Sequence, residues 1–251
     1  MAPPESTTRS STIDIDYALE ILAKGKMQER HGLMPWSSNY TFLVTIQYAN
    51  VEALAIYKPS RGERPLWDFP DGTLAHREVA AFQVSHALGW HFVPPTVLRD
   101  GFLGPGAVQL FIEVDPEAHY FTLRDDHEPV FQRVAIFDYI INNADRKGGH
   151  CLKDVEGNIW TIDHGLTFHT DYKLRTVIWD FAGQPIPADI LGDLSRLQQT
   201  MNQPSNSILR ALAQLITDRE LTMFRRRMER TLNTRKFPEP GAGRNIPFPP
   251  I

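Results

Sequence analysis

The chain contains little cysteine, no long apolar run and no large excess of either charge. Cys151 is its single cysteine, which excludes an intrachain disulfide and is typical of a reducing compartment. No apolar run approaches the ~20 residues of a membrane-spanning helix, and the first twelve residues, MAPPESTTRSST, lack the apolar core of a signal peptide. A net charge of −4 gives no general attraction to nucleic acid or anionic lipid. We therefore expect a soluble, cytoplasmic protein with no nucleic-acid partner and no stable membrane association.

The composition is that of a globular protein, with 42% hydrophobic and 22% charged residues. A chain of 251 residues is long enough for one large domain or for two lobes around a cleft. Proline and glycine cluster near the C-terminus, where FPEPGAGRNIPFPP favours neither helix nor strand. We predict a disordered lead over 1–12, a β-rich lobe over 13–113, a helical lobe over 114–236 and a Pro/Gly-rich tail over 237–251. The oligomeric state is left open.

Local patterns in the first half alternate between strand and helix. β-rich runs separated by Ala49 and Asn50 predict a hairpin. The spacing of Leu74, Glu78 and Ala81 predicts one face of a helix that Gly89 ends. The expected helices span 13–24 and 73–88, and the expected strands span 40–48, 51–58, 96–99 and 107–114.

The second half is mainly helical in pattern. Val130, Val134, Phe137 and Ile141 have helical spacing. The expected hairpin has strands at 151–153 and 158–163, and further helices are expected over 188–201 and 205–232. The whole pattern predicts an α+β fold with a β-rich N-lobe and a helical C-lobe.

Two aspartates stand out by their positions. Asp145 lies in a loop after an apolar helix, and Asp163 lies at the end of a short strand. Two carboxylates on neighbouring loops, one beside a reacting hydroxyl and one on a metal ion, suit phosphoryl transfer from ATP. The structural alternatives are a turn aspartate that accepts loop N–H groups and a strand-end cap.

A series of motifs in a fixed order resembles the phosphatidylinositol 3-/4-kinase superfamily, and most of all its type II phosphatidylinositol 4-kinases and an uncharacterised bacterial branch. The resemblance runs from about Trp36 to Trp179. Each motif is weak alone, and their common order carries the resemblance. The motifs are WSSNYTFL, AIYKP, HREVAAFQVSHALG, FVPPTVL, GAVQLFIE, DYIINNADRKGGH and IDHG.

The resemblance implies a two-lobed, atypical kinase fold that binds ATP between its lobes. Ser37 and Ser38 would belong to the loop that covers the phosphates. Lys58 would bind the phosphates as a flexible ammonium group, and Glu78 would orient it. Glu63 is a rival partner for Lys58, because it lies in a loop whose path the sequence does not predict.

The resemblance also assigns adenine binding to the hinge between the lobes. Backbone groups of Glu113 and Val114 would bind adenine there, with Ile56 and Ile162 as apolar walls.

For catalysis, the resemblance makes Asp145 the residue that orients the attacking hydroxyl and accepts its proton. Asp163 and His150 would bind the metal ion, which we expect to be Mg²⁺ with Mn²⁺ as an alternative.

His150 departs from the family, which has asparagine at this position. Three readings remain open: an altered metal preference, a histidine held away from the metal, or weakened catalysis. Asn142 or Asn143 is a further candidate for the missing amide oxygen. Glycines 148 and 149 also replace polar residues of the lipid-kinase loop, so the identity of the acceptor is open.

The function we predict is ATP- and Mg²⁺-dependent transfer of the γ-phosphate to a hydroxyl of a lipid, a protein or a small molecule. The alternatives are a nucleotide-binding pseudokinase and a nucleotidyl transferase.

Two other clusters have functional alternatives. A zinc hydrolase is the less favoured reading of the cluster His150, Cys151, Asp163, His164 and His169, which matches no zinc spacing. The basic run Arg225-Arg226-Arg227, with Arg230, predicts a solvated helix face, with an acidic partner or a phospholipid surface as the alternative.

Overall fold

The computed structural model describes residues 14–33, 40–203 and 205–251. The predicted lead over 1–12 and the predicted phosphate-loop residues Ser37 and Ser38 lie outside the described residues. Among the described residues, no helix combines the length and the apolar character needed to cross a membrane.

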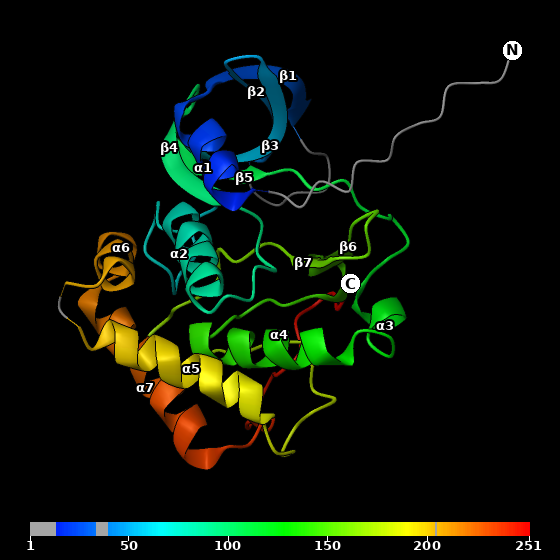
Figure 1. The fold of residues 1–251 in the computed structure, drawn as a ribbon, viewed down its shortest axis with the longest axis vertical. Coiled ribbons are helices and arrows are strands. Elements are labelled where there is room, and N and C mark those ends of the chain that lie inside the picture. The colour runs from blue at the N-terminus through cyan, green and yellow to red at the C-terminus, as the bar shows by residue number, and fades with distance from the viewer. Residues whose placement is uncertain (1–13, 34–39, 204) are drawn as a thin grey trace, which may run out of the picture.

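An antiparallel five-stranded sheet forms the N-terminal part of the protein, with strand order β1-β2-β3-β5-β4. Helix α1 (Ile15–Lys24) packs against the sheet, and Figure 1 shows it inside the curve of the strands. Ile21 and Leu22 of this helix are buried with Val44, Ile46 and Tyr57 of the sheet. The strands are β1 (Lys26–Leu33), β2 (Phe42–Tyr48), β3 (Val51–Pro59), β4 (Thr96–Gly101) and β5 (Gly104–Leu110).

Four of these strands were expected, but two details of the prediction were wrong. Strand β1 was not predicted, and β5 starts at Gly104 and ends at Leu110 instead of spanning 107–114. The β2–β3 hairpin is confirmed, and its turn uses Ala49 at a left-handed φ of 51°.

Helix α2 (Leu74–Ala87) lies between the sheet and the helical part of the chain (Figure 1). The predicted helix is confirmed, and Leu74, Glu78 and Ala81 are buried as one face. The helix is buried on its other sides as well, since Val79 and Phe82 are also buried. The helix contacts β4, β5 and α6 (Ser207–Leu215). Glu78 is therefore carried on an element that packs on both parts of the protein.

Helices and one small hairpin make up the C-terminal part. A continuous apolar core joins α4, α5 and α7, with Phe131, Phe137, Leu194 and Phe224 fully buried. The connection from β5 to the first of these helices contains Glu113 and Val114. The elements are α3 (Tyr120–Leu123), α4 (Glu128–Ile141), β6 (Cys151–Lys153), β7 (Ile159–Thr161), α5 (Ala188–Met201), α6 and α7 (Asp218–Thr234).

The single helix expected over 205–232 is two helices. Helix α6 ends at Leu215, and α7 begins after Thr217. The Thr217 hydroxyl accepts from the Glu220 backbone N–H, and the Glu220 carboxylate accepts from the Thr217 backbone N–H. This capping box stabilises a new helix start, so the prediction of one helix over 205–232 was wrong.

The segment after Phe237 contains no helix or strand, as predicted, but it packs against the C-terminal part. Pro250 accepts a 2.7 Å hydrogen bond from the backbone N–H of Gly148. Asn245 accepts hydrogen bonds from the backbone of Thr176 and the indole of Trp179. The C-terminus therefore lies beside the loop that contains Asp145 (Figure 1).

Candidate active site

A cleft of about 400 Å³ lies between the sheet and the helical part. Its lining combines residues from β3, from α2, from the loop after α4 and from the loop after β7. The charged and titratable residues of the lining include Lys58, Glu78, Asp145, Lys147, His150 and Asp163.

Lys58, Glu78 and Asp163 meet in this cleft from three distant parts of the chain. The Lys58 ammonium group donates to Glu78 Oε1 at 2.5 Å and to Asp163 Oδ1 at 3.2 Å. Burial opposes the charged ammonium, but the two carboxylates raise the pKa of Lys58 above its ordinary value. Lys58 also holds the pKa of Asp163 well below its usual range, so this carboxylate and the Lys58 ammonium group are both charged at neutral pH.

Glu78, and not its rival Glu63, is the partner of Lys58. The Glu63 carboxylate instead accepts from the backbone N–H groups of Leu74 and Ala75, at the start of α2. A carboxylate at a helix N-terminus satisfies free donors and suits the helix dipole.

Glu78 also fixes the loop that carries Asp163. Its second carboxylate oxygen accepts from the backbone N–H of His164 at 2.9 Å. Asp163 itself has a left-handed φ of 62°, which is uncommon for a residue with a side chain. Its side chain is half exposed, so the carboxylate remains accessible to a ligand.

A buried guanidinium group holds the loops of Asp145 and Asp163 together. Arg146 forms an ion pair with Asp138 of α4, and both side chains are fully buried. It donates to the carbonyl of Ile162 at 2.9 Å and lies 2.7 Å from His164 Nε2. Because an arginine can only donate, His164 accepts through Nε2 and carries its proton on Nδ1. Neither Arg146 nor Asp138 was among the site residues predicted from the sequence.

Asp145 lies in the same cleft, in a partly buried position. Burial raises its pKa, and the nearby ammonium group of Lys147, 3.1 Å from Asp145 Oδ2, opposes that rise. Its backbone N–H donates to Asn143 Oδ1. Asn143 and Asn142 use their amide oxygens within the protein, since Asn142 Oδ1 accepts from the Lys173 backbone. Neither asparagine lines the cleft that contains Asp163, and their role as metal ligands stays a prediction.

The imidazole of His150 lies beside Asp163, with Nε2 at 3.4 Å from Asp163 Oδ2. Burial lowers the pKa of His150 to about 4, and the neighbouring cations Arg146 and Lys147 contribute to the shift. The ring is therefore neutral at pH 7, and its buried Nδ1 has no hydrogen-bond partner among the described residues. Asp163 and a neutral His150 fit a divalent cation whose other ligands are phosphate oxygens and water.

Close packing explains why position 148 is a glycine. A Cβ at that position would lie 2.9 Å from the ring of Phe121. The loop before His150 therefore lies against α3 through a residue without a side chain.

The predicted adenine-binding residues do not line this cleft. Glu113 is exposed and Val114 is half-buried, and Val114 pairs with Asp154 in an isolated bridge. Ile56 and Ile162 are also outside its lining. The adenine site stays a prediction.

The zinc cluster is not assembled. Cys151 is fully buried, and burial raises the pKa of its thiol to about 12. His169 accepts a hydrogen bond from the Asp171 backbone. Within the part of the chain that the structure describes, no three His, Cys, Asp or Glu side chains are grouped to hold a metal.

Several solved structures have a fold similar to that of this chain, and two of those compared below are kinases. The Golgi casein kinase with Mn/ADP bound matches 87% of this chain and 74% of its own, at 15% identity and a TM-score of 0.56. The match to the Helicobacter pylori proinflammatory kinase CtkA covers 86% of this chain and 94% of the kinase chain, at 13% identity and a TM-score of 0.53. Hydra Fam20 with sugar matches 90% of both chains, at 15% identity and a TM-score of 0.51. The fold is therefore kinase-like, as predicted.

The more specific assignment to phosphatidylinositol 3-/4-kinases is not confirmed by these neighbours, which are described as other kinds of kinase. No family model matches the sequence. A protein of Mycobacterium tuberculosis, Rv2133c, is 38% identical over 264 residues, which cover 91% of this chain and 94% of that protein. This chain belongs to the same protein family as Rv2133c.

Proposed function

We propose that the protein is an ATP-dependent phosphotransferase that transfers the γ-phosphate to a hydroxyl group. The observation that carries this proposal is the contact of Lys58 with both Glu78 and Asp163, in a cleft that also contains Asp145. A lysine held by a helix glutamate beside a metal-binding aspartate is the arrangement that kinases use for polyphosphate. The kinase-like fold supports the same reading.

In this proposal, Lys58 binds phosphate oxygens while Glu78 keeps the ammonium group in place. Asp163, with His150 beside it, holds Mg²⁺ or Mn²⁺, and one solved neighbour contains Mn and ADP. A divalent cation at this place neutralises charge on the phosphates. Ser37, Ser38, Glu113 and Val114 complete the nucleotide site.

Asp145 acts on the acceptor. A carboxylate in this loop orients the attacking hydroxyl and accepts its proton. Burial raises the pKa of Asp145, which makes the carboxylate a better base than an exposed aspartate. The acceptor is an alcohol of a lipid, a protein or a small molecule.

The test is incubation with γ-labelled or α-labelled ATP and either Mg²⁺ or Mn²⁺. Label from the γ-position on protein, extracted lipid or a soluble acceptor is the expected result. Label from the α-position indicates nucleotidyl transfer, and ATP binding without either transfer indicates a pseudokinase.

Two variants separate the roles of the aspartates. Asp163→Asn should weaken metal-dependent ATP binding, whereas Asp145→Asn should bind ATP and lose transfer. Asp125→Asn is the matched control, because Asp125 is a surface carboxylate with 94% of its side chain exposed. If Asp145→Asn and Asp163→Asn lose ATP binding to the same extent while folded, the division of roles is wrong.

A further inference from the structure

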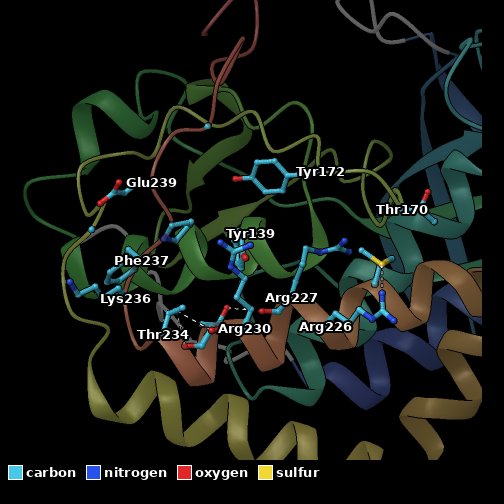
Figure 2. Close-up of a pocket in the computed structure, with 15 residues that line it drawn as sticks. Tyr139, Thr170, Tyr172, Arg226, Arg227, Arg230, Thr234, Lys236, Phe237 and Glu239 are labelled. Carbon is cyan, nitrogen blue, oxygen red and sulfur yellow. Dashed lines mark hydrogen bonds between the residues drawn. The ribbon is translucent and has the colours of Figure 1, made fainter.

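A second cavity, of about 560 Å³, lies in the helical part and shares no lining residue with the cleft of Lys58. Figure 2 shows Arg227 and Arg230 extending from α7, with Tyr139 and Tyr172 beyond the helix, Lys236 and Phe237 at one side of the cavity and Arg226 at the other. The basic run was predicted to be a solvated helix face. That prediction holds for Arg226 and Arg230 but is wrong for Arg227, which is only 6% exposed.

Arg227 is buried without a carboxylate partner among the described residues. Its Nε donates to the Ile140 carbonyl at 2.8 Å, and its Nη1 lies 3.4 Å from the His169 carbonyl. Its Nη2 makes no hydrogen bond to the described residues, although it is shielded from solvent. Burial lowers the pKa of Arg227 to about 10, and the Glu220 carboxylate, which is paired with Arg77, opposes this shift only in part. A buried polar group of this kind normally has a partner.

The surrounding charges do not supply that partner. Arg226, Arg230 and Lys236 add three more cations to the lining, and Glu239 is the only carboxylate among the described residues that line the cavity. Within those residues, none of the four cations lies at ion-pair distance from a carboxylate. The cavity therefore has an excess of positive charge.

Aromatic side chains supply the other part of the lining. The rings of Tyr139 and Tyr172 are packed edge to face, with centroids 6.2 Å apart, and Phe237 contributes a third ring. The volume is that of a small-molecule site. A ring or chain of carbon atoms fits such walls, and guanidinium groups match the oxygen geometry of phosphate.

We propose that this cavity binds a phosphate monoester with an apolar body, at a site separate from the cleft that contains Lys58. Arg230 would donate to the phosphate and Lys236 would add a point charge, while the positive charge of Arg227, buried behind the cavity wall, would attract the phosphate. The three aromatic rings would contact the carbon part. This inference goes beyond the proposed phosphotransfer, because it does not depend on ATP binding at Lys58.

The test compares phenyl phosphate, inorganic phosphate and phenol by titration calorimetry with the full chain. Phenyl phosphate should bind more tightly than inorganic phosphate, and phenol should not bind. The double variant Arg230→Gln/Lys236→Gln removes two exposed cations of the lining, so it should fold normally. We expect its affinity for phenyl phosphate to fall by on the order of tenfold or more, the effect of losing charge-assisted contacts.

The matched control is Arg219→Gln/Arg235→Gln, which removes two exposed charges of the same region that do not line the cavity. It should keep the wild-type affinity, and so should Lys58→Ala. An equal loss in this control would show general charge attraction and would overturn the proposal. A loss of phenyl phosphate affinity in Lys58→Ala would place the ligand in the other cleft and would also overturn the proposal. So would a wild type that does not bind phenyl phosphate at millimolar concentration.

Sedimentation with phosphatidylcholine vesicles that contain phosphatidic acid identifies the source of the phosphate. A lipid headgroup is the ligand if the wild type and Arg219→Gln/Arg235→Gln pellet with the vesicles and Arg230→Gln/Lys236→Gln does not. Binding of phenyl phosphate without pelleting would support a soluble ester. Pelleting without any binding of phenyl phosphate, equal in both double variants, would contradict the proposed site.

Discussion

Replacing Glu78 by glutamine tests the link between the fold and the candidate active site. Glu78 uses one carboxylate oxygen for the Lys58 ammonium group and the other for the His164 backbone N–H. Both partners are donors. A glutamine side chain has only one acceptor oxygen, so its NH₂ group must face a donor in the Glu78→Gln variant.

The expected loss of stability in Glu78→Gln depends on the burial of Glu78 and on the contacts that Lys58 keeps. The Glu78 side chain is 4% exposed, and a hydrogen bond to a charged group contributes about 1.5–3 kcal/mol. Removing one partner of a fully buried ion pair costs about 3–5 kcal/mol. Lys58 is partly exposed and keeps Asp163 at 3.2 Å, which reduces the loss. We therefore expect a decrease of about 2–4 kcal/mol in the free energy of unfolding.

Urea unfolding of the wild type, Glu78→Gln, Lys58→Met and the double variant measures this loss and its cause. The pair should show a coupling energy of at least about 1 kcal/mol, because the two side chains are in direct contact. Glu229→Gln changes an exposed glutamate of α7 and should stay within about 0.5 kcal/mol of the wild type. Additive effects of Glu78→Gln and Lys58→Met, or a Glu78→Gln variant as stable as Glu229→Gln, would refute the reasoning.

Three further substitutions probe other parts of the protein. Lys58→Ala should weaken ATP binding by about 1.5–3 kcal/mol, because a charge-assisted contact is lost. If calorimetry gives this variant the ATP affinity of the wild type, the assignment of Lys58 to phosphate binding is wrong. His150→Asn should raise turnover with Mg²⁺ relative to Mn²⁺, because an amide oxygen is a harder ligand than imidazole. If the ratio of the two turnover rates is the same in the variant and the wild type, His150 does not bind the metal. Asp154→Ala should lower the free energy of unfolding by about 2–3 kcal/mol, because this carboxylate accepts from Asn158 and from the Trp160 indole. Burial raises the pKa of Asp154, but these hydrogen bonds outweigh burial and lower it. The wild type's advantage in urea unfolding should therefore be fully present above about pH 4, the pKa of an unfolded aspartate, and be lost as the pH falls through the lower pKa of the folded state. A wild-type advantage that does not decrease as the pH is lowered would contradict this.

The sequence was sufficient to predict those helices and strands whose local residue pattern matches the structure. Helix α2 was predicted from the spacing of Leu74, Glu78 and Ala81, and the β2–β3 hairpin from two β-rich runs around a short turn. Strand β1 was missed because KMQERHGL has no alternating apolar pattern. It is a strand because it pairs with β2 over Lys26 to Glu29 and again at Leu33, an interaction that no local pattern specifies.

Within the site, motif order predicted which residues would lie near one another, but not their hydrogen bonds. Lys58 and Asp163 are over a hundred residues apart and meet as the resemblance implied. The capping role of Glu63 depends on the path of a Pro/Gly-rich loop, which sequence does not encode in a readable way. The ion pair of Arg146 with Asp138 was missed because either residue, read alone, has the pattern of a surface charge.

Three buried arginines show why the second cavity differs from the structural ion pairs of this protein. Arg77 is paired with Glu220, and Arg146 with Asp138, so each buried guanidinium group has a carboxylate at hydrogen-bond distance. Arg227 has only backbone carbonyls among the described residues. A buried charge without a counter-charge is unfavourable for stability. The other two arginines show that the fold can supply a carboxylate where the role is structural, so the missing partner of Arg227 is best accounted for by an anion that comes from outside the chain.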